Sequence, residues 1–166
     1  AMDIEGLGPA IIETFVNVGM INKTYDIYNL DPDKIASLEG FKQTSAKNII
    51  NSVNNSKKND LSKLIFALGI RHIGAKAGKL LADHFKNIDE IMNASVDDIL
   101  EIDGFGVVMA QSVVEFFESD SSKELIEKLK EVGVNMISTN VIKDNRFEGM
   151  TFVLTGTLPT LKRSEA

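Results

Sequence analysis

The sequence predicts an all-α fold made of four tandem copies of one unit, in which a short helix, a tight turn and a longer helix follow one another. The first observation is an internal repeat, in which an apolar residue and a turn containing glycine precede three variable residues, a small residue and an apolar pair. The four segments are Asp3–Ile12, Leu38–Ile50, Gly69–Leu81 and Ile102–Val114. The second observation is their spacing: the second turn position recurs after 34, 32 and 32 residues, at Gly8, Lys42, Gly74 and Gly106. Such a period indicates one supersecondary unit repeated along the chain.

A short amphipathic helix is expected before the turns. Residues 32–38 and 96–102 show the pattern most clearly. Asp31 and Ser95 stand at the N-cap positions of these stretches, where a side-chain oxygen accepts a hydrogen bond from a free backbone N–H. Pro9 is well placed to begin the helix that follows the first turn.

A longer amphipathic helix is expected after the turns, because apolar residues recur there every three or four positions. The sets are Ala46, Ile49, Ile50 and Val53, then Leu80, Leu81, His84 and Phe85, then Ala110, Val113, Val114 and Phe117. A closing amphipathic helix is expected over residues 120–132, with Leu125, Ile126, Leu129 and Val132 on one face.

The turns are expected to pack between their helices. Glycine permits a positive φ and a close approach of the backbone. The apolar residue between the two turn positions is expected to point inward; it is Leu7, Phe41, Ile73 or Phe105. A small residue four positions beyond the second turn position lets the two helices cross closely; it is Ala46, Gly78 or Ala110, whereas the first repeat has Ile12.

Composition places the chain among ordinary globular proteins. Of its 166 residues, 43% are hydrophobic and 25% are charged, which excludes a disordered or low-complexity chain. The chain contains no cysteine, which excludes disulfides, a cysteine nucleophile and a cysteine-ligated zinc within these residues. It contains only two histidines, His72 and His84, which is too few for a typical transition-metal site. No apolar run approaches the roughly 18 residues of a membrane span, so a soluble intracellular protein is expected.

Charge is distributed unevenly along the chain, although the net charge is -6. Residues 40–80 contain eight basic side chains and one acidic one, whereas residues 81–121 contain one basic and ten acidic ones. The basic block is a local electrostatic footprint of the kind that attracts polyanions.

Each turn is expected to form a site for phosphate. A tight turn at the start of a helix presents successive backbone N–H groups at the end where the helix dipole favours negative charge. The residues predicted to contact phosphate are the turn glycines and the neighbouring cations. They are Gly6, Gly8, Gly40, Lys42, Lys47, Arg71, His72, Gly74, Lys76, Lys79, Gly104 and Gly106.

Two repeats depart from this pattern. Lys42 occupies the second turn position of repeat two, so a side-chain charge is expected to substitute for one close backbone contact. Repeat four has Asp103 beside its turn, and no Lys or Arg lies between Lys86 and Lys123. Its turn is expected either to contact phosphate through the backbone alone or to complete the packed array.

The repeat unit resembles the helix-hairpin-helix motif. Four tandem copies that open with Ala-Met-Asp-Ile-Glu-Gly-Leu-Gly resemble the bacterial NAD-dependent DNA ligases. Residues 66–74 are similar to the third hairpin of that family, and residues 152–158 are similar to the opening of the BRCT domain that follows the hairpins there. The resemblance predicts a tandem helix-hairpin-helix DNA-binding domain over residues 1–137, in a compact array of two pseudo-symmetric pairs around an Ile/Leu/Phe core. A linker over 138–149 and a truncated α/β BRCT start over 150–166 are predicted to follow.

The resemblance also implies a function. The family seals nicks in replication and repair, with NAD as the AMP donor, and its hairpins bind the duplex backbone around the nick without sequence preference. The twelve phosphate-contacting residues would then be DNA-binding residues. The implied partners are nicked double-stranded DNA and the adenylation, OB and zinc-finger domains of the same chain, with no membrane, in the bacterial cytoplasm at the nucleoid.

The resemblance implies NAD, magnesium and structural zinc for the full-length family, but no cofactor for this segment. The AMP-accepting lysine of the family lies in a Lys-x-Asp-Gly motif, and the nearest string here, Lys58-Asn-Asp-Leu61, lacks the glycine. No catalytic residue is therefore predicted, and the segment alone is expected to be inactive. Because the chain has no cysteine, it is expected to begin just after the four-cysteine zinc finger of the family.

Two alternatives remain at this point. One is a base-excision glycosylase, because these enzymes also carry a helix-hairpin-helix. Their catalytic lysine follows the second glycine by two residues, as Lys76 follows Gly74. Asp97 lies at about the spacing of their catalytic aspartate, although this chain has no Gly/Pro-rich loop between the two residues. A protein-binding scaffold is the other alternative, in which the acidic residues 81–121 and the Phe116-Phe117 pair would form an interface.

Overall fold

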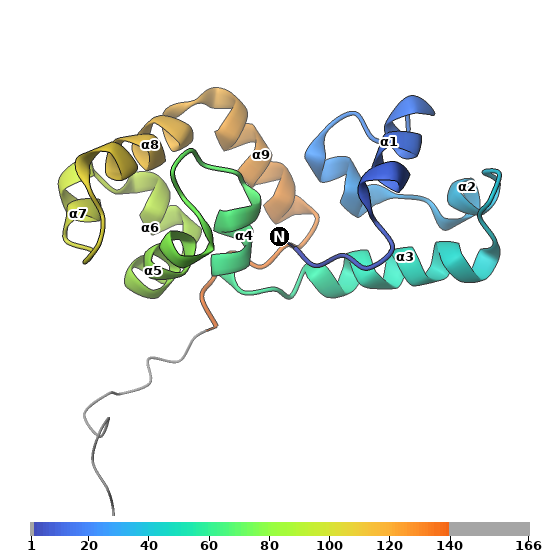
Figure 1. The fold of residues 1–166 in the computed structure, drawn as a ribbon, viewed down its shortest axis with the longest axis horizontal. Coiled ribbons are helices and arrows are strands. Elements are labelled where there is room, and N and C mark those ends of the chain that lie inside the picture. The colour runs from blue at the N-terminus through green and yellow to red at the C-terminus, as the bar shows by residue number, and fades with distance from the viewer. Residues whose placement is uncertain (1, 140–166) are drawn as a thin grey trace, which may run out of the picture.

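The computed structural model describes residues 2–139, and every regular element in that range is helical (Figure 1). The elements are α1 (Pro9–Asn17), the 3-10 helix η1 (Thr24–Asn29), α2 (Pro32–Ala36), α3 (Gln43–Ser56), α4 (Leu61–Ala67), α5 (Ala75–Phe85), α6 (Ile88–Asn93), α7 (Val96–Leu100), α8 (Val107–Glu118) and α9 (Asp120–Glu131). The all-α prediction is confirmed for this range, where the isolated bridge between Asn87 and Ile137 is the one β-type pairing. The predicted BRCT start, and residues 140–149 of the predicted linker, lie outside the described residues.

The predicted helices occur close to their expected bounds. Helices α2, α7 and α9 begin at residues 32, 96 and 120, as the sequence predicts. Asp31 accepts a hydrogen bond from the N–H of Asp33 at 2.9 Å, and the Ser95 hydroxyl accepts one from Asp98 at 3.2 Å, so both expected caps form. Repeat one differs, because residues 2–5 before its turn are not helical.

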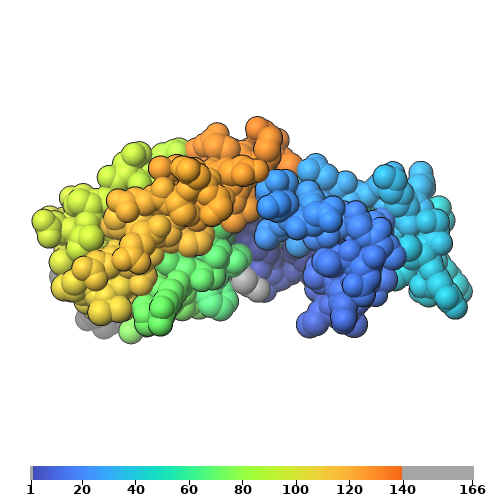
Figure 2. Space-filling model, turned by 90° about the horizontal axis from the view of Figure 1, so that it is seen from above, coloured from blue at the N-terminus to red at the C-terminus, as the bar shows by residue number. Residues whose placement is uncertain are grey.

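The four repeats form two lobes, each with its own core (Figure 1). Repeats one and two bury a small core of Phe15, Ile21, Ile35, Ala46, Ile49 and Val53. Repeats three and four enclose a larger core that runs from Leu61 to Val134 and includes Leu81, Ile99, Phe117 and Ile126. The prediction of a single Ile/Leu/Phe core around two pairs of hairpins is therefore wrong in one respect, because each pair has its own core. Figure 2 shows the lobes as two masses, with α9 reaching the N-terminal one.

Aromatic residues of η1 join the two lobes. The Tyr25 hydroxyl donates to Oε1 of Glu124 on α9 at 3.5 Å. Tyr28 packs against both cores, and Nζ of Lys57 lies 5.9 Å from the centroid of its ring. Burial raises the pKa of Tyr28, as expected for a phenol held between two packed surfaces.

The N-terminal segment makes a second connection. Nδ2 of Asn59 donates to the backbone oxygen of Met2 at 2.7 Å. Nζ of Lys63 on α4 pairs with Asp3 at 2.5 Å. Both side chains of that pair are largely exposed, so it contributes little to stability and acts mainly by fixing where the segment lies.

Residues 134–139 run as a strap across the C-terminal lobe. The backbone N–H of Asn135 donates to the oxygen of Lys57 at 2.8 Å, and the N–H of Ser138 donates to the oxygen of Lys86 at 2.7 Å. The N–H and hydroxyl of Thr139 both donate to Oδ1 of Asp60, at 2.6 and 2.9 Å. The first two residues of the predicted linker are therefore still bonded to the fold.

The small residue predicted at each helix crossing is buried. Ala46 and Ala110 have no exposed surface. A Cβ on Gly78 would lie 3.2 Å from the backbone oxygen of Ser62 and 3.4 Å from the backbone nitrogen of Phe66, both on α4. Glycine therefore sets how closely α4 and α5 approach, whereas Ile12, in the first repeat, is only partly buried.

Substituting valine at Gly78 is expected to lower the free energy of unfolding by about 1–3 kcal/mol, because the added atoms meet the α4 backbone, which cannot rotate away. Chemical denaturation of Gly78→Val measures this loss. Gly74→Ala is the matched control, since its added Cβ meets no atom within 4 Å and its φ is negative; it is expected to stay within about 0.5 kcal/mol. Equal losses in the two variants would contradict the close crossing.

Asp60 is expected to make the fold sensitive to acid. Burial raises the pKa of its carboxyl, but hydrogen bonds from Ser62 and Thr139 outweigh that effect and lower the pKa from 3.8 to about 2. Because the folded-state pKa lies below the ordinary value, the carboxylate stabilises the fold above about pH 4, and this contribution disappears as the pH falls towards 2. Allowing for the exposed part of the group, the contribution is about 1 kcal/mol.

The variant Asp60→Asn keeps an acceptor oxygen at the start of α4 but cannot titrate. Its unfolding free energy is expected to be lower than that of the parent at pH 7 and to fall less steeply between pH 4 and pH 2. Urea denaturation at several pH values measures both quantities. Parallel pH profiles for the two proteins would rule out this role of the carboxylate.

Candidate nucleic-acid interface

All four repeats contain the same turn. Its first residue has a positive φ, which is 82° at Gly6, 86° at Gly40, 65° at His72 and 90° at Gly104. In each case the N–H of the next residue donates back to the oxygen three positions earlier, with lengths of 3.3, 3.1, 3.0 and 3.0 Å in chain order. The repeat seen in the sequence is therefore a repeat of backbone geometry.

The third turn adopts this geometry without a glycine at its first position. His72 takes the left-handed conformation there, which is strained for an L-residue with a β-carbon. Its side chain is exposed. Sequence reasoning selected His72 as a phosphate-contacting side chain and did not recognise its backbone role, although the alignment of the repeats places it opposite Gly6, Gly40 and Gly104.

The middle residue of each turn points into a lobe, as predicted. Ile73 and Phe105 are 5% and 9% exposed and belong to the larger core. Leu7 and Phe41 are partly buried against the smaller core, and the ring of Phe41 lies 5.6 Å from that of Phe15. Each turn is thus anchored to the protein by one apolar side chain, and its polar backbone is left at the surface.

The helices that follow the turns begin differently from the others. Helices α1, α3, α5 and α8 have Gly8, Lys42, Gly74 and Gly106 as N-caps, all extended, and no cap side chain accepts a bond from their first N–H groups. A side-chain oxygen caps each of the other α-helices in residues 2–139; the caps are Asp31, Asp60, Asn87, Ser95 and Ser119. The N–H groups at the four turns are therefore the ones available to an external acceptor.

The second turn is a partial exception. The backbone N–H of Lys42 donates to Oγ of Ser45 at 2.9 Å, and the same hydroxyl donates to the oxygen of Lys42 at 2.8 Å. One N–H that is available at the other turns already has a partner here. Lys42 itself is exposed, and the substitution of its side-chain charge for a backbone contact stays a prediction.

The predicted site residues all lie at the surface. The twelve residues from Gly6 to Gly106 are exposed. Within residues 2–139, Lys63, Lys128 and Lys130 form ion pairs with acidic side chains, and Lys42, Lys47, Arg71 and Lys76 take part in none of these pairs. Unpaired exposed cations beside uncapped helix starts suit a polyanion rather than a buried catalytic centre.

The fourth turn is flanked in the chain by apolar and acidic residues. Val107 and Val108 begin α8 and are 53% and 60% exposed, and Asp103 before the turn is also exposed. What this turn can offer to a phosphate is its backbone N–H groups, because no basic side chain adjoins it in the chain.

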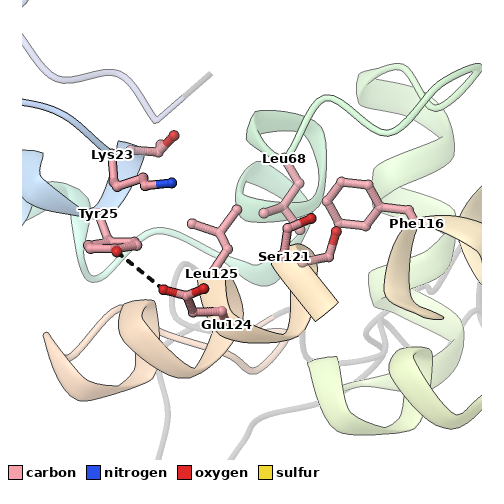
Figure 3. A pocket seen from close by; sticks show the side chains of 9 residues that line it. Lys23, Tyr25, Leu68, Phe116, Ser121, Glu124 and Leu125 are labelled. Carbon is pink, nitrogen blue, oxygen red and sulfur yellow. Dashed lines mark hydrogen bonds between the residues drawn. The ribbon is translucent and has the colours of Figure 1, made fainter. Parts of the chain in front are cut away.

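The residues behind the two alternatives lie on helices α5, α7 and α8. Lys76 lies in the first turn of α5 and Asp97 in the first turn of α7, both exposed at the surface. Phe117 is buried at 2% exposure and packs edge-on against Phe116, with ring centroids 5.1 Å apart. Phe116 itself lines a cleft of about 280 Å³ between the lobes, which also includes Leu68 and Leu125 (Figure 3).

Residues 2–139 contain no group of three or more histidine and acidic side chains arranged to hold a metal ion. Nor does this range contain a helix long and apolar enough to cross a membrane.

Comparison with known families defines the class of the fold. A family described as a SAM-like helix-hairpin-helix tandem matches residues 1–55, and the helix-hairpin-helix motif family matches residues 63–126. The two matches correspond to the two lobes. The chain is thus a tandem helix-hairpin-helix protein.

The curated relatives are DNA ligases. The chain is 48% identical over 170 residues to the DNA ligase of Acetivibrio thermocellus, and 47% identical over 169 residues to that of Clostridioides difficile. It is 46% identical over 166 residues to the DNA ligase of Carboxydothermus hydrogenoformans. These alignments cover 100% of the chain and 25–26% of the relatives, so the chain spans about a quarter of their length. Over its whole length the chain is therefore similar to a segment of DNA ligases, and its own family matches are to helix-hairpin-helix families.

The left-handed turn at His72 yields a test of the repeat geometry. His72→Val is expected to lower the unfolding free energy by about 1–2 kcal/mol, because a β-branched side chain is poorly tolerated at positive φ, whereas His72→Gly is expected to be neutral or stabilising. Arg71→Val, at a neighbouring exposed residue without a positive φ, is the control. Thermal unfolding ranks the stability of the three variants. If His72→Val were as stable as His72→Gly, the left-handed conformation assigned to His72 would be contradicted.

Proposed function

We propose that this chain binds duplex DNA around a nick, without sequence preference, as the DNA-gripping segment of an NAD-dependent DNA ligase. The observation that carries the proposal is the set of four equivalent turns, each followed by a helix whose first N–H groups no cap side chain satisfies. Phosphate oxygens can accept hydrogen bonds from these N–H groups, and the helix dipole favours the negative charge of a phosphate at this end of the helix. The similarity of the whole chain to a segment of DNA ligases supports duplex DNA as the source of these phosphates.

The proposed contacts divide into two kinds. Backbone N–H groups at Gly8, Gly74 and Gly106 hold phosphates at fixed positions, which sets the register of the protein on the duplex. Arg71, Lys76 and the other exposed cations near the second and third turns supply the charge, which releases counterions and makes binding depend on salt. The fourth turn contacts phosphate through its backbone alone.

The chemistry of nick sealing is proposed for the whole protein. In that proposal, NAD supplies AMP, magnesium assists phosphoryl transfer and zinc stabilises a finger domain, all outside these residues. This segment supplies no catalytic group, is inactive alone, and works with the adenylation, OB and zinc-finger domains of the same chain in the bacterial cytoplasm. Its contribution is to hold the duplex in place while those domains act.

The proposal predicts steep salt dependence that follows the cations. The logarithm of the affinity for duplex DNA is expected to fall linearly with the logarithm of the salt concentration. The double variant Arg71→Ala and Lys76→Ala is expected to bind all DNA sequences more weakly by the same factor, and to reduce the slope of that plot by about two. Fluorescence anisotropy with nicked and intact duplexes of two sequences measures this. Lys123→Ala removes the same kind of charge from α9, which follows no hairpin turn, and is the control.

Absence of binding by the parent chain at low salt would overturn the proposal. Binding that is lost equally in the control variant would show attraction by overall charge rather than by the turns. Equal affinity for nicked and intact duplexes would assign nick recognition to the other domains of the ligase and leave backbone binding to this segment.

A further inference from the structure

A polar groove lies beside the first two turns. Its volume is about 670 Å³, and its walls include Gly6 and Gly40, the left-handed glycines of the first two turns. The polar wall belongs to α3 and consists of Ser45, Asn48, Asn51, Ser52 and Asn55. We call this feature the asparagine groove. A Cβ on Gly6 would lie 3.1 Å from Cγ1 of Ile49, so the first turn rests directly on α3 next to these side chains.

The asparagines of the groove have no role within the described fold. Asn48, Asn51 and Asn55 are exposed, and their side chains take part in none of the hydrogen bonds formed among residues 2–139. Elsewhere the fold does use asparagine carboxamides, as at Asn59, Asn87 and Asn135. Asparagine is also a weaker helix former than alanine, so three of them in α3 disfavour the helix they occupy.

The chemistry of the groove defines its ligand. Each carboxamide offers two donors and one acceptor without a net charge. No lysine or arginine lines the groove, and Glu5 does, so a free small anion is not attracted to it. A sugar-phosphate strand held at the neighbouring turns brings both acceptor oxygens and polar sugar atoms to the groove, and neutral asparagine and serine side chains commonly contact such strands.

We propose that the asparagine groove is an additional DNA-contact surface, where Asn48, Asn51 and Asn55 hydrogen-bond the sugar-phosphate backbone of the strand bound by the first two turns. This inference rests on the proposed function. It assigns DNA contacts to a helix face that the sequence analysis did not select, and it makes the less basic N-terminal lobe contribute through neutral groups.

The test is the triple variant Asn48→Ala, Asn51→Ala and Asn55→Ala in the whole chain. Its affinity for duplex DNA is expected to fall roughly tenfold, because several modest hydrogen bonds are lost. Its salt slope is expected to equal that of the parent, because no charge is removed. Folding is expected to be retained, since alanine favours the helix and the substituted side chains are exposed; denaturant unfolding of the variant checks this.

Asn54→Ala is the matched control. Asn54 is an exposed asparagine of the same helix, and it does not line the groove. Its DNA affinity is expected to equal that of the parent.

The outcomes separate the two proposals. If the parent chain binds DNA and the Arg71 and Lys76 variant weakens binding, but the triple variant binds like the parent, the groove proposal is overturned and the proposed function stands. A changed salt slope in the triple variant, or an equal loss in Asn54→Ala, also overturns it. If the parent chain binds no DNA, both proposals fail together.

Discussion

The arrangement of the four turns at the surface depends on one constraint: each turn contains a residue in the left-handed conformation and is closed by one backbone hydrogen bond. The positive φ at Gly6, Gly40, His72 and Gly104 reverses the chain within a few residues. Because the reversal is tight, the next helix begins at the surface with its first N–H groups facing outward, and the residue inside the turn faces the core. A negative φ at this residue would make the connection between the helices longer. The first N–H groups of the helix would then no longer face outward directly beside a residue that faces the core.

The packing beneath the turns makes them rigid. Each middle residue is held in or against a core, and where the paired helices cross, a small residue such as Gly78 lets them approach to backbone contact. The proposed binding of phosphate through the backbone amides of these turns benefits from this support, because amides fixed in advance lose little entropy when they bind. The division into two cores means that each pair of turns is supported by its own lobe, while Tyr28 and the segment at Met2 connect the lobes.

The acidic part of the chain has a structural explanation that is compatible with a polyanionic ligand. Asp89 and Glu90 lie in the first turn of α6, and Asp97 and Asp98 lie in the first turn of α7, where negative charge is favoured by the helix dipole. Hydrogen bonds from the Ser95 hydroxyl and N–H lower the pKa of Asp98, and Asp89 pairs with Lys130 of α9 at 2.6 Å. These carboxylates stabilise the capped helices, whereas the helices that follow the turns have no acidic residue in their first turns.

The sequence by itself determined the repeat, the turns and the helices that follow the turns, because the spacing of glycines and of apolar residues depends only on neighbours in the chain. It did not predict η1 or α6. It also predicted the caps Asp31 and Ser95 and the exposed cations near Lys76, since each depends on neighbours in the chain. It did not by itself show that His72 adopts a glycine conformation, because a residue with a β-carbon is rare at positive φ, although the alignment of the repeats places His72 opposite three glycines. Nor could it place Asn48 and Asn55 beside Gly6, or divide the core into two. Those features depend on contacts between residues far apart in sequence, and only the packing of the helices against one another decides them.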